Sequence, residues 1–340
     1  MEETGFIVTI AYPDTIVRVA NGELISKLWP VFGVGGKNKV QAGHAALLLI
    51  SKKNNTIEYF DFGRYITSDT FGRVRSEQTD YEVHIPMKAK HDGKEIKNLK
   101  EVLLFLEDNP EKTHGEGRMV VSVNHKINHA KAKKFISELQ SQNHVPYGAF
   151  KKNSTNCARF VTDALIQSCV DSKIVQRLQR SKYLTPSPIS NVINGGSCNN
   201  SFFEIFHQEI KVYNNKSIAK EHWECFFNKV CQNIDEIGTV LPDTLKYNNE
   251  KAQWLGGIGS GAWFEIYATN ELKEYQIIRK NKEGIVDVDA VFRIATEGFY
   301  IEKAFRFLHG SNGLVCYISQ NAKVYEFNFL KKTNSKLHLQ

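Results

Sequence analysis

A β-hairpin is predicted by GHAALLLISKKNNTIEYFDF (Gly43–Phe62), in which two apolar runs flank the polar turn SKKNN. If Ile50 pairs with Ile57, the numbers of facing residues sum to 107 and Ala46 lies opposite Asp61. The register matters because a shift by one residue moves every side chain to the other face of the sheet.

This hairpin brings a histidine and a carboxylate together. His44 opens the first strand, and Asp61 lies diagonally next to it on the same face, within reach of a longer side chain. Histidine titrates near neutral pH and can accept a proton from a nucleophile, while a carboxylate can orient its ring. A register shift would offer Glu58 in place of Asp61. The alternative is that His44 is structural and Asp61 only belongs to the strand-ending turn.

A helix is predicted to begin within KKNSTNCARFVTDAL (Lys151–Leu165), with Cys157 in its first turn. Three preceding residues can cap it: Ser154, Thr155 and Asn156. Unpaired N–H groups and the helix dipole favour negative charge at this end, so they stabilise a thiolate and can bind an oxyanion. The alternative is that Cys157 is simply a small buried residue.

The order of these segments resembles that of the permuted NlpC-type cysteine peptidases, which are papain-like. The resemblance rests on GH before an apolar strand, an acidic hairpin, and NC before a helix, over residues 5–180. It implies that Cys157 is the nucleophile, His44 its base, and Asp61 or Glu58 the third residue. Lecithin:retinol acyltransferase-like enzymes share the order but carry a second histidine where this sequence has Asp61. The whole chain also resembles a two-domain group with the same GHAALLLI and DFGRY signatures.

Four further residues are candidates for substrate binding. Arg64, Arg73 and Arg75 follow the hairpin and could hold a substrate carboxylate through two hydrogen bonds each, or they could form surface ion pairs. Tyr147 could line the cleft near Cys157 or pack in the interior.

Several classes of protein are disfavoured by composition. Six cysteines without a CxxC pair argue against a disulfide scaffold or a thiolate zinc site, and HKINH (His125–His129) lacks the glutamate of a zincin motif. We therefore expect no metal and no cofactor. The net charge of +7 comes without a nucleic-acid-binding motif, so no nucleic acid is expected. The sequence shows no signal peptide or apolar membrane span, which predicts a cytoplasmic protein.

The expected fold class is α+β, with two domains. Residues 1–190 would form a permuted papain-like domain, an antiparallel sheet packed on helices that includes a strand at Tyr81–Pro86. A linker rich in Pro, Gly, Ser and Asn (residues 184–201) would lead to a smaller β-rich α+β domain at 200–340, with a helical stretch near Ser217–Ile234. A glycine-rich loop at Phe32–Gly43 would border the cleft.

The predicted function is hydrolysis of an amide or peptide bond through an acyl-enzyme on Cys157. By analogy, the substrate could be a stem peptide of the cell-wall type. Two alternatives stay open at this point: acyl transfer to a lipid or amine by the same residues, and a catalytically silent papain-like scaffold that binds a partner. The sequence gives no oligomeric state.

Overall fold

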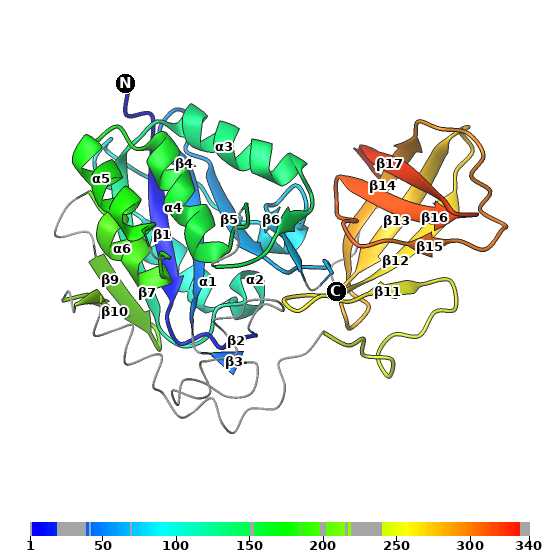
Figure 1. Ribbon diagram of the computed structural model, residues 1–340, viewed down its shortest axis with the longest axis horizontal. Coiled ribbons are helices and arrows are strands. Elements are labelled where there is room, and N and C mark those ends of the chain that lie inside the picture. The colour runs from blue at the N-terminus through cyan, green and yellow to red at the C-terminus, as the bar shows by residue number, and fades with distance from the viewer. Residues whose placement is uncertain are drawn as a thin grey trace. The chain divides into compact units, whose positions relative to one another are not determined.

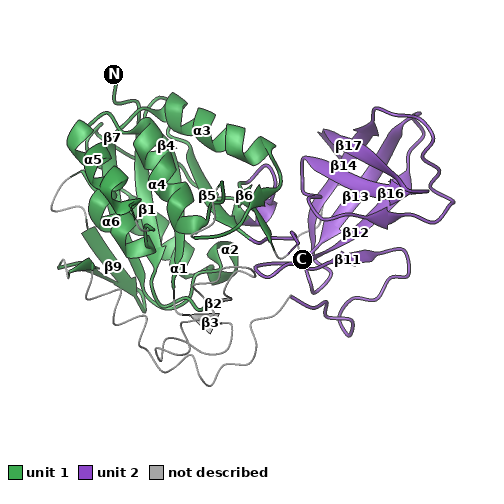
Figure 2. Ribbon diagram, viewed as in Figure 1, with its two compact units in different colours: residues 1–63, 69–76, 83–238 green, residues 64–68, 77–82, 239–340 purple. Residues whose placement is uncertain are grey.

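The computed structural model describes residues 2–18, 39–40, 42–68, 70–149, 153–183, 185–197, 202–214, 217–218 and 240–333. The chain forms two compact units (Figure 2). Unit 1 comprises residues 1–63, 69–76 and 83–238, and unit 2 comprises residues 64–68, 77–82 and 239–340. Residues 32–38 of the glycine-rich loop and nearly all of the helical stretch expected at Ser217–Ile234 lie outside the described residues.

Unit 1 is built on an eight-stranded sheet in the order β10-β9-β7-β1-β4-β5-β6-β8, and its neighbouring strands run antiparallel. The strands are β1 (Gly5–Tyr12), β4 (His44–Ser51), β5 (Ile57–Gly63), β6 (Phe71–Arg75), β7 (Met119–Ile127), β8 (Val145–Pro146), β9 (Phe202–Phe206) and β10 (Glu209–Val212). Two short strands, β2 (Val17–Arg18) and β3 (Lys39–Val40), pair separately.

Helices cover both faces of this sheet. Figure 1 shows α3 (His129–Ser141), α4 (Cys157–Ser168), α5 (Ser172–Ser181) and α6 (Pro188–Gly195) in front of it, with α1 (Leu99–Glu107) and α2 (Pro110–Thr113) behind. Because both faces are covered, β1 and β4 are buried along their whole length. Removing one leucine side chain from water stabilises the fold by about 1.5–3 kcal/mol, so these strands anchor the core.

The predicted hairpin register is confirmed. Ala46 pairs with Asp61 and Ile50 pairs with Ile57 in the β4–β5 ladder. Alternate residues of β4 therefore enter two cores. Ala46 and Leu48 pack on the side of α1, and Ala45 and Leu47 pack against α4.

Unit 2 is a seven-stranded antiparallel sheet in the order β11-β12-β13-β14-β17-β16-β15. Its strands are β11 (Gln253–Leu255), β12 (Ala262–Ala268), β13 (Glu274–Lys280), β14 (Val286–Ile294), β15 (Arg306–Phe307), β16 (Val315–Gln320) and β17 (Lys323–Lys332). The side chain of Gln253 joins the two edge strands, because it donates to the carbonyl of Phe305 (3.1 Å) and accepts from the N–H of Phe307 (2.8 Å).

The α+β class is confirmed by the helix-covered antiparallel sheet and the separate β-rich unit. Two local predictions are wrong. Residues Tyr81–Val83 form a 3-10 turn rather than a strand, and the expected linker contains helix α6. Helix α6 is stabilised by a capping box between Ser187 and Ser190 and is largely buried, so this stretch belongs to the core of unit 1.

Candidate active site

His44 stands at the first position of β4, directly after a glycine with a constrained backbone. Gly43 has φ +73°, and a Cβ atom there would come within 2.9 Å of the carbonyl oxygen of Tyr12. Only glycine adopts this conformation without strain, and the conformation starts β4 at His44. The imidazole itself is buried, with the residue 7% exposed.

Asp61 holds one side of the imidazole. Its Oδ2 lies 3.2 Å from Nε2 of His44. The carboxylate also accepts hydrogen bonds from Nε (3.0 Å) and Nη2 (2.6 Å) of Arg75, and from the hydroxyl of Tyr59 (3.0 Å). Burial raises the pKa of Asp61, but Arg75 and His44 outweigh it and hold that pKa well below its usual range. Asp61 is therefore a fixed anion at the centre of this network.

Cys157 is the second hydrogen-bond partner of the His44 imidazole. It is the first residue of α4, as predicted, and its cap Asn156 accepts a hydrogen bond from the N–H of Arg159 at 2.9 Å. The first backbone donor within the helix is Phe160, so the helix supplies no partner for the N–H groups of Cys157 and Ala158. These two N–H groups can bind a developing oxyanion.

The protonation of His44 reflects both neighbours. Burial lowers the pKa of His44, but hydrogen bonds to Asp61 and Cys157 outweigh it and raise the pKa to about 9. At neutral pH the ring is therefore an imidazolium. Nε2 is the ring nitrogen that faces Asp61.

The position of His44 at a strand end explains how it reaches both groups. Asp61 lies on the sheet face that packs towards α1, whereas Cys157 belongs to α4 on the opposite face. The side chain of a residue in the middle of β4 would lie on one face of the sheet, and the sheet would separate it from either Asp61 or Cys157. Tyr12, opposite His44 in the ladder, stacks on its ring with centroids 6.5 Å apart.

Glu58, the alternative to Asp61, lies away from this cluster. It pairs with Leu49 in the β4–β5 ladder and forms an ion pair with Lys133 of α3. The register thus explains why Asp61, and not Glu58, shares the face of His44.

The three arginines expected to bind substrate are all buried. Arg75 is 0% exposed and donates hydrogen bonds to both oxygens of Asp61. Its guanidinium therefore holds Asp61 and is not exposed for a substrate. Arg73 is 2% exposed in β6, and Arg64 is 5% exposed in unit 2. Tyr147 stacks on Phe62 with ring centroids 6.0 Å apart.

Sequence reasoning missed the roles of Arg75 and Tyr59 as partners of Asp61. The signal was present in FGRVR (Phe71–Arg75), whose pairing with β5 sets Arg75 opposite Asp61. Tyr59 precedes Asp61 by two residues and therefore shares its face.

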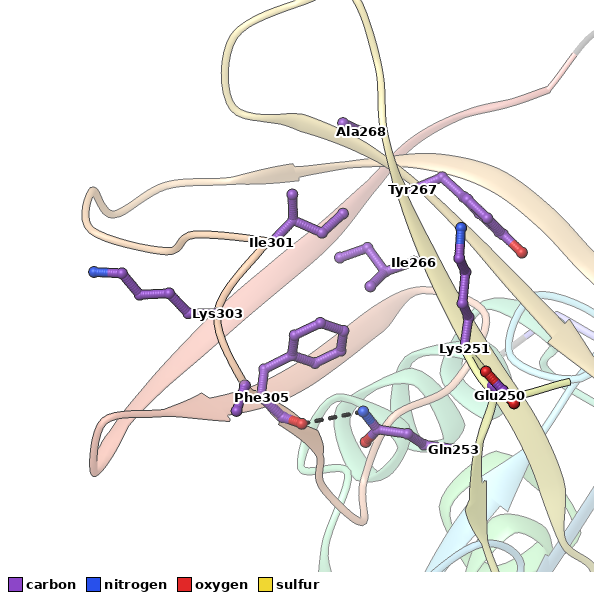
Figure 3. A pocket seen from close by; sticks show the side chains of 10 residues that line it. Glu250, Lys251, Gln253, Ile266, Tyr267, Ala268, Ile301, Lys303 and Phe305 are labelled. Carbon is purple, nitrogen blue, oxygen red and sulfur yellow. Dashed lines mark hydrogen bonds between the residues drawn. The ribbon is translucent and has the colours of Figure 1, made fainter.

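Unit 2 has a hollow of about 480 Å³ whose lining includes none of the residues predicted for catalysis (Figure 3). It is lined by Glu250, Lys251, Gln253, Ile266, Tyr267, Ala268, Ile301, Lys303, Ala304 and Phe305. Within the described part of the chain, no group of three or more His, Cys, Asp or Glu residues could hold a metal ion. Nor does any helix there have the length and apolarity to cross a membrane.

The chain resembles known families in two separate regions. Residues 7–174, which contain the whole candidate site, match the family described as type VI secretion system effector TseH-like. Residues 252–330 match a second family, the DUF6695 C-terminal domain.

The crystal structure of the type VI secretion system effector TseH is 16% identical, covers 62% of this chain and 98% of its own, and has a TM-score of 0.37. No curated protein matches the chain.

Proposed function

We propose that this protein is a cysteine hydrolase that cleaves an amide or peptide bond, with Cys157 as nucleophile and His44 as acid and base. The observation that carries the proposal is the single imidazole that hydrogen-bonds to both Asp61 and Cys157. Nucleophile, base and orienting carboxylate in this order are the arrangement that acyl transfer requires.

The reaction follows from these positions. With His44 in its imidazolium form, Cys157 reacts as the thiolate, its proton already held by the ring, and the sulfur attacks the carbonyl carbon of the substrate. The N–H groups of Cys157 and Ala158 bind the oxyanion. His44 then donates its proton to the leaving amine as the C–N bond breaks. In the second half, His44 takes a proton from water, the hydroxide attacks the thioester, and the Cys157 thiolate leaves.

Asp61 and Arg75 prepare His44 for this role. Asp61 fixes the orientation of the ring and favours its protonated form, which is the form that protonates the leaving amine. Arg75 keeps Asp61 ionised and holds both of its oxygens. Both residues act through His44, so they are positioning residues.

The proposed substrate class is a stem peptide of the cell-wall type. Support comes from the permuted NlpC-like order of the site and from the match of residues 7–174 to a family of secreted effectors. A substrate-carboxylate contact at Arg64 or Arg73 stays a prediction. The cytoplasmic location expected from the sequence also stays a prediction, since a secreted effector would leave that compartment.

Incubation with purified muropeptides tests the proposal. We expect new amine and carboxyl termini by mass spectrometry with the wild type, and none with Cys157→Ala or His44→Ala. Cys169→Ala is the matched control, because Cys169 is a free, buried cysteine at the other end of α4 and should leave turnover unchanged. Transfer of an acyl group to an added amine would favour the acyltransferase alternative. A folded wild type without any turnover would favour the silent scaffold.

A further inference from the structure

The oxygen of Asp61 that faces His44 is shared with two other donors. Oδ2 lies 3.2 Å from Nε2 of His44, 3.0 Å from the hydroxyl of Tyr59 and 2.6 Å from Nη2 of Arg75. The other oxygen, Oδ1, accepts from Nε of Arg75 at 3.0 Å. A carboxylate oxygen offers roughly two lone-pair directions. Three donors must therefore share Oδ2, and each weakens the hold of this oxygen on the other two.

Arg75 is sufficient to keep Asp61 in place. Its guanidinium donates to both carboxylate oxygens, and its Nη2 also donates to the carbonyl of Lys112 (3.1 Å). A bidentate pair of this kind fixes the orientation of the carboxylate, and both side chains are 0% exposed. We therefore expect Asp61 to keep its position when the hydroxyl of Tyr59 is removed. The remaining effect of that hydroxyl is on the charge at Oδ2.

The hydroxyl of Tyr59 has one proton and two acceptors. Oδ2 of Asp61 lies at 3.0 Å and the carbonyl oxygen of Thr113 at 3.5 Å. The ionised and nearer acceptor forms the stronger hydrogen bond, so the proton is assigned to Asp61. Tyr59 is 2% exposed, which keeps its hydroxyl away from bulk water. Tyr59 thus donates to the same oxygen that holds the proton of His44.

We propose that Tyr59 is a positioning residue that acts through Asp61: by donating to Oδ2, it limits how strongly the carboxylate holds His44 in its protonated form. This inference rests on the proposed function of Cys157 and His44. In the acyl-enzyme the sulfur belongs to the thioester, so it no longer supports the imidazolium as a thiolate. Asp61 then has the larger share in holding the proton, while the ring must be neutral to accept a proton from water. Tyr59 therefore favours the second half of the reaction.

Other titratable or charged groups also face the imidazole or its partners. They lie on four elements besides β5: Arg75 of β6, Cys157 of α4, Tyr12 of β1, and Glu107 of α1, which acts on Tyr12. All of them are retained when only the hydroxyl of Tyr59 is removed. A change in the titration of His44 then reports on that hydroxyl.

The test compares Tyr59→Phe with Tyr213→Phe. Phenylalanine keeps the ring and removes the hydroxyl. Tyr213 is the matched control, because it is a tyrosine of unit 1 that is 5% exposed and packs in a different core cluster with Val192. Circular dichroism and thermal unfolding establish that both variants fold. Tyr59→Met is a second variant without the hydroxyl, with a flexible side chain that fills irregular gaps.

The first readout is the titration of the His44 imidazole by NMR, assigned with His44→Gln. In Tyr59→Phe we expect the midpoint to rise from near 9 by about half a pH unit, because Oδ2 holds the imidazolium more strongly. Tyr213→Phe should match the wild type. A purely structural role of Tyr59 would lower the melting temperature without moving this midpoint.

The second readout is deacylation with p-nitrophenyl acetate as the probe. The thiolate of Cys157 displaces p-nitrophenolate and leaves an acetyl thioester, which water hydrolyses to acetate and the free thiol. Intact mass spectrometry follows the loss of the acetyl group. We expect Tyr59→Phe to deacetylate about threefold more slowly at neutral pH, since the neutral fraction of the imidazole falls by that factor.

Two outcomes overturn the inference. A midpoint that falls in Tyr59→Phe would show that the hydroxyl orients Asp61 instead of competing for it. A midpoint equal to that of Tyr213→Phe would show that the proton of the hydroxyl belongs to Thr113. If Tyr59→Phe does not fold, Tyr59→Met decides by the same criteria.

Failure of the inference differs from failure of the proposed function. If the wild type cleaves muropeptides and the midpoint does not rise in Tyr59→Phe, the inference is overturned and the proposed function stands. If muropeptides stay intact but the midpoint rises and deacetylation slows, Tyr59 acts on His44 as inferred and the proposed function fails.

Discussion

At the scale of single residues, the account depends on the contrast between Asp61 and Glu58. Both are carboxylates of β5, but the register directs Asp61 to His44 and Glu58 to Lys133. Their burial differs as well, since the side chain of Asp61 is fully buried and that of Glu58 is 28% exposed. The two positions therefore form a natural pair of variants.

Asp61→Asn should lower kcat by about 10²–10⁴-fold, because the amide no longer stabilises the imidazolium and can favour the wrong tautomer. It should also lower the melting temperature, since Arg75 loses its charged partner in a buried site. Steady-state kinetics on a cleaved muropeptide provides the measurement. Glu58→Gln should retain wild-type kcat, and an equal loss in both variants would contradict the assignment.

The pH dependence of kcat/KM follows from His44. Its pKa is raised to about 9, so the imidazolium persists at neutral pH and is lost as the pH rises through that value. Since the proton of His44 is needed for the leaving amine, kcat/KM should fall as pH rises through about 9. Rates measured from neutral pH to pH about 10 check this. A profile that falls near the ordinary pKa of histidine would show that Asp61 and Cys157 do not support the charge.

At the scale of elements, Gly43 sets where β4 begins. Gly43→Ala places a Cβ against the carbonyl of Tyr12 in a backbone conformation that L-residues rarely adopt. We expect a loss of about 1–3 kcal/mol in the free energy of unfolding and a reduced kcat, because His44 moves with the strand start. Urea unfolding and kinetics measure the two effects. Gly93→Ala is the control: it has φ +93° but no atom near its Cβ, so it carries the backbone strain away from the site.

The elements that carry the candidate site were largely predictable because their signals are local. The cap residues before Cys157 predict the start of α4, which begins at that residue. The side-chain contact between His44 and Asp61 follows from the register of one hairpin, in which Ala46 pairs with Asp61. The segment Tyr81–Pro86 was mistaken for a strand because Val83 and Ile85 alternate with polar residues, yet both enter the core without pairing.

Other features depend on contacts that the local sequence does not show. The segment with α6 suggested a linker by composition, although Pro188 after Ser187 is also a helix start. Strand β9 pairs with β7, which lies far away in the sequence, and this fixes its place in unit 1. The burial of Arg75 could not be predicted without knowing that β6 is the strand beside β5. The place of β9 and the burial of Arg75 are set by strand pairing between distant segments, which local secondary-structure propensity does not reveal.

At the scale of the whole molecule, the raised pKa of His44 links stability to pH. Its folded pKa of about 9 exceeds the ordinary value of 6.5, so its contribution is fully present below pH 6.5 and is lost as pH rises through 9. The shift corresponds to a contribution on the order of 3 kcal/mol. Calorimetry of the wild type against His44→Gln should show a stability difference that shrinks over this window. A constant difference would contradict the linkage.

Selective alkylation of Cys157 tests the central claim most directly. The wild type is treated with limiting iodoacetamide at neutral pH, and the modified cysteine is located by peptide mapping. We predict that Cys157 reacts first and that His44→Ala slows its alkylation at least tenfold, because the imidazolium that stabilises the thiolate is lost. Preferential labelling of Cys169 or Cys316, or an unchanged rate at Cys157 in His44→Ala, would contradict the account.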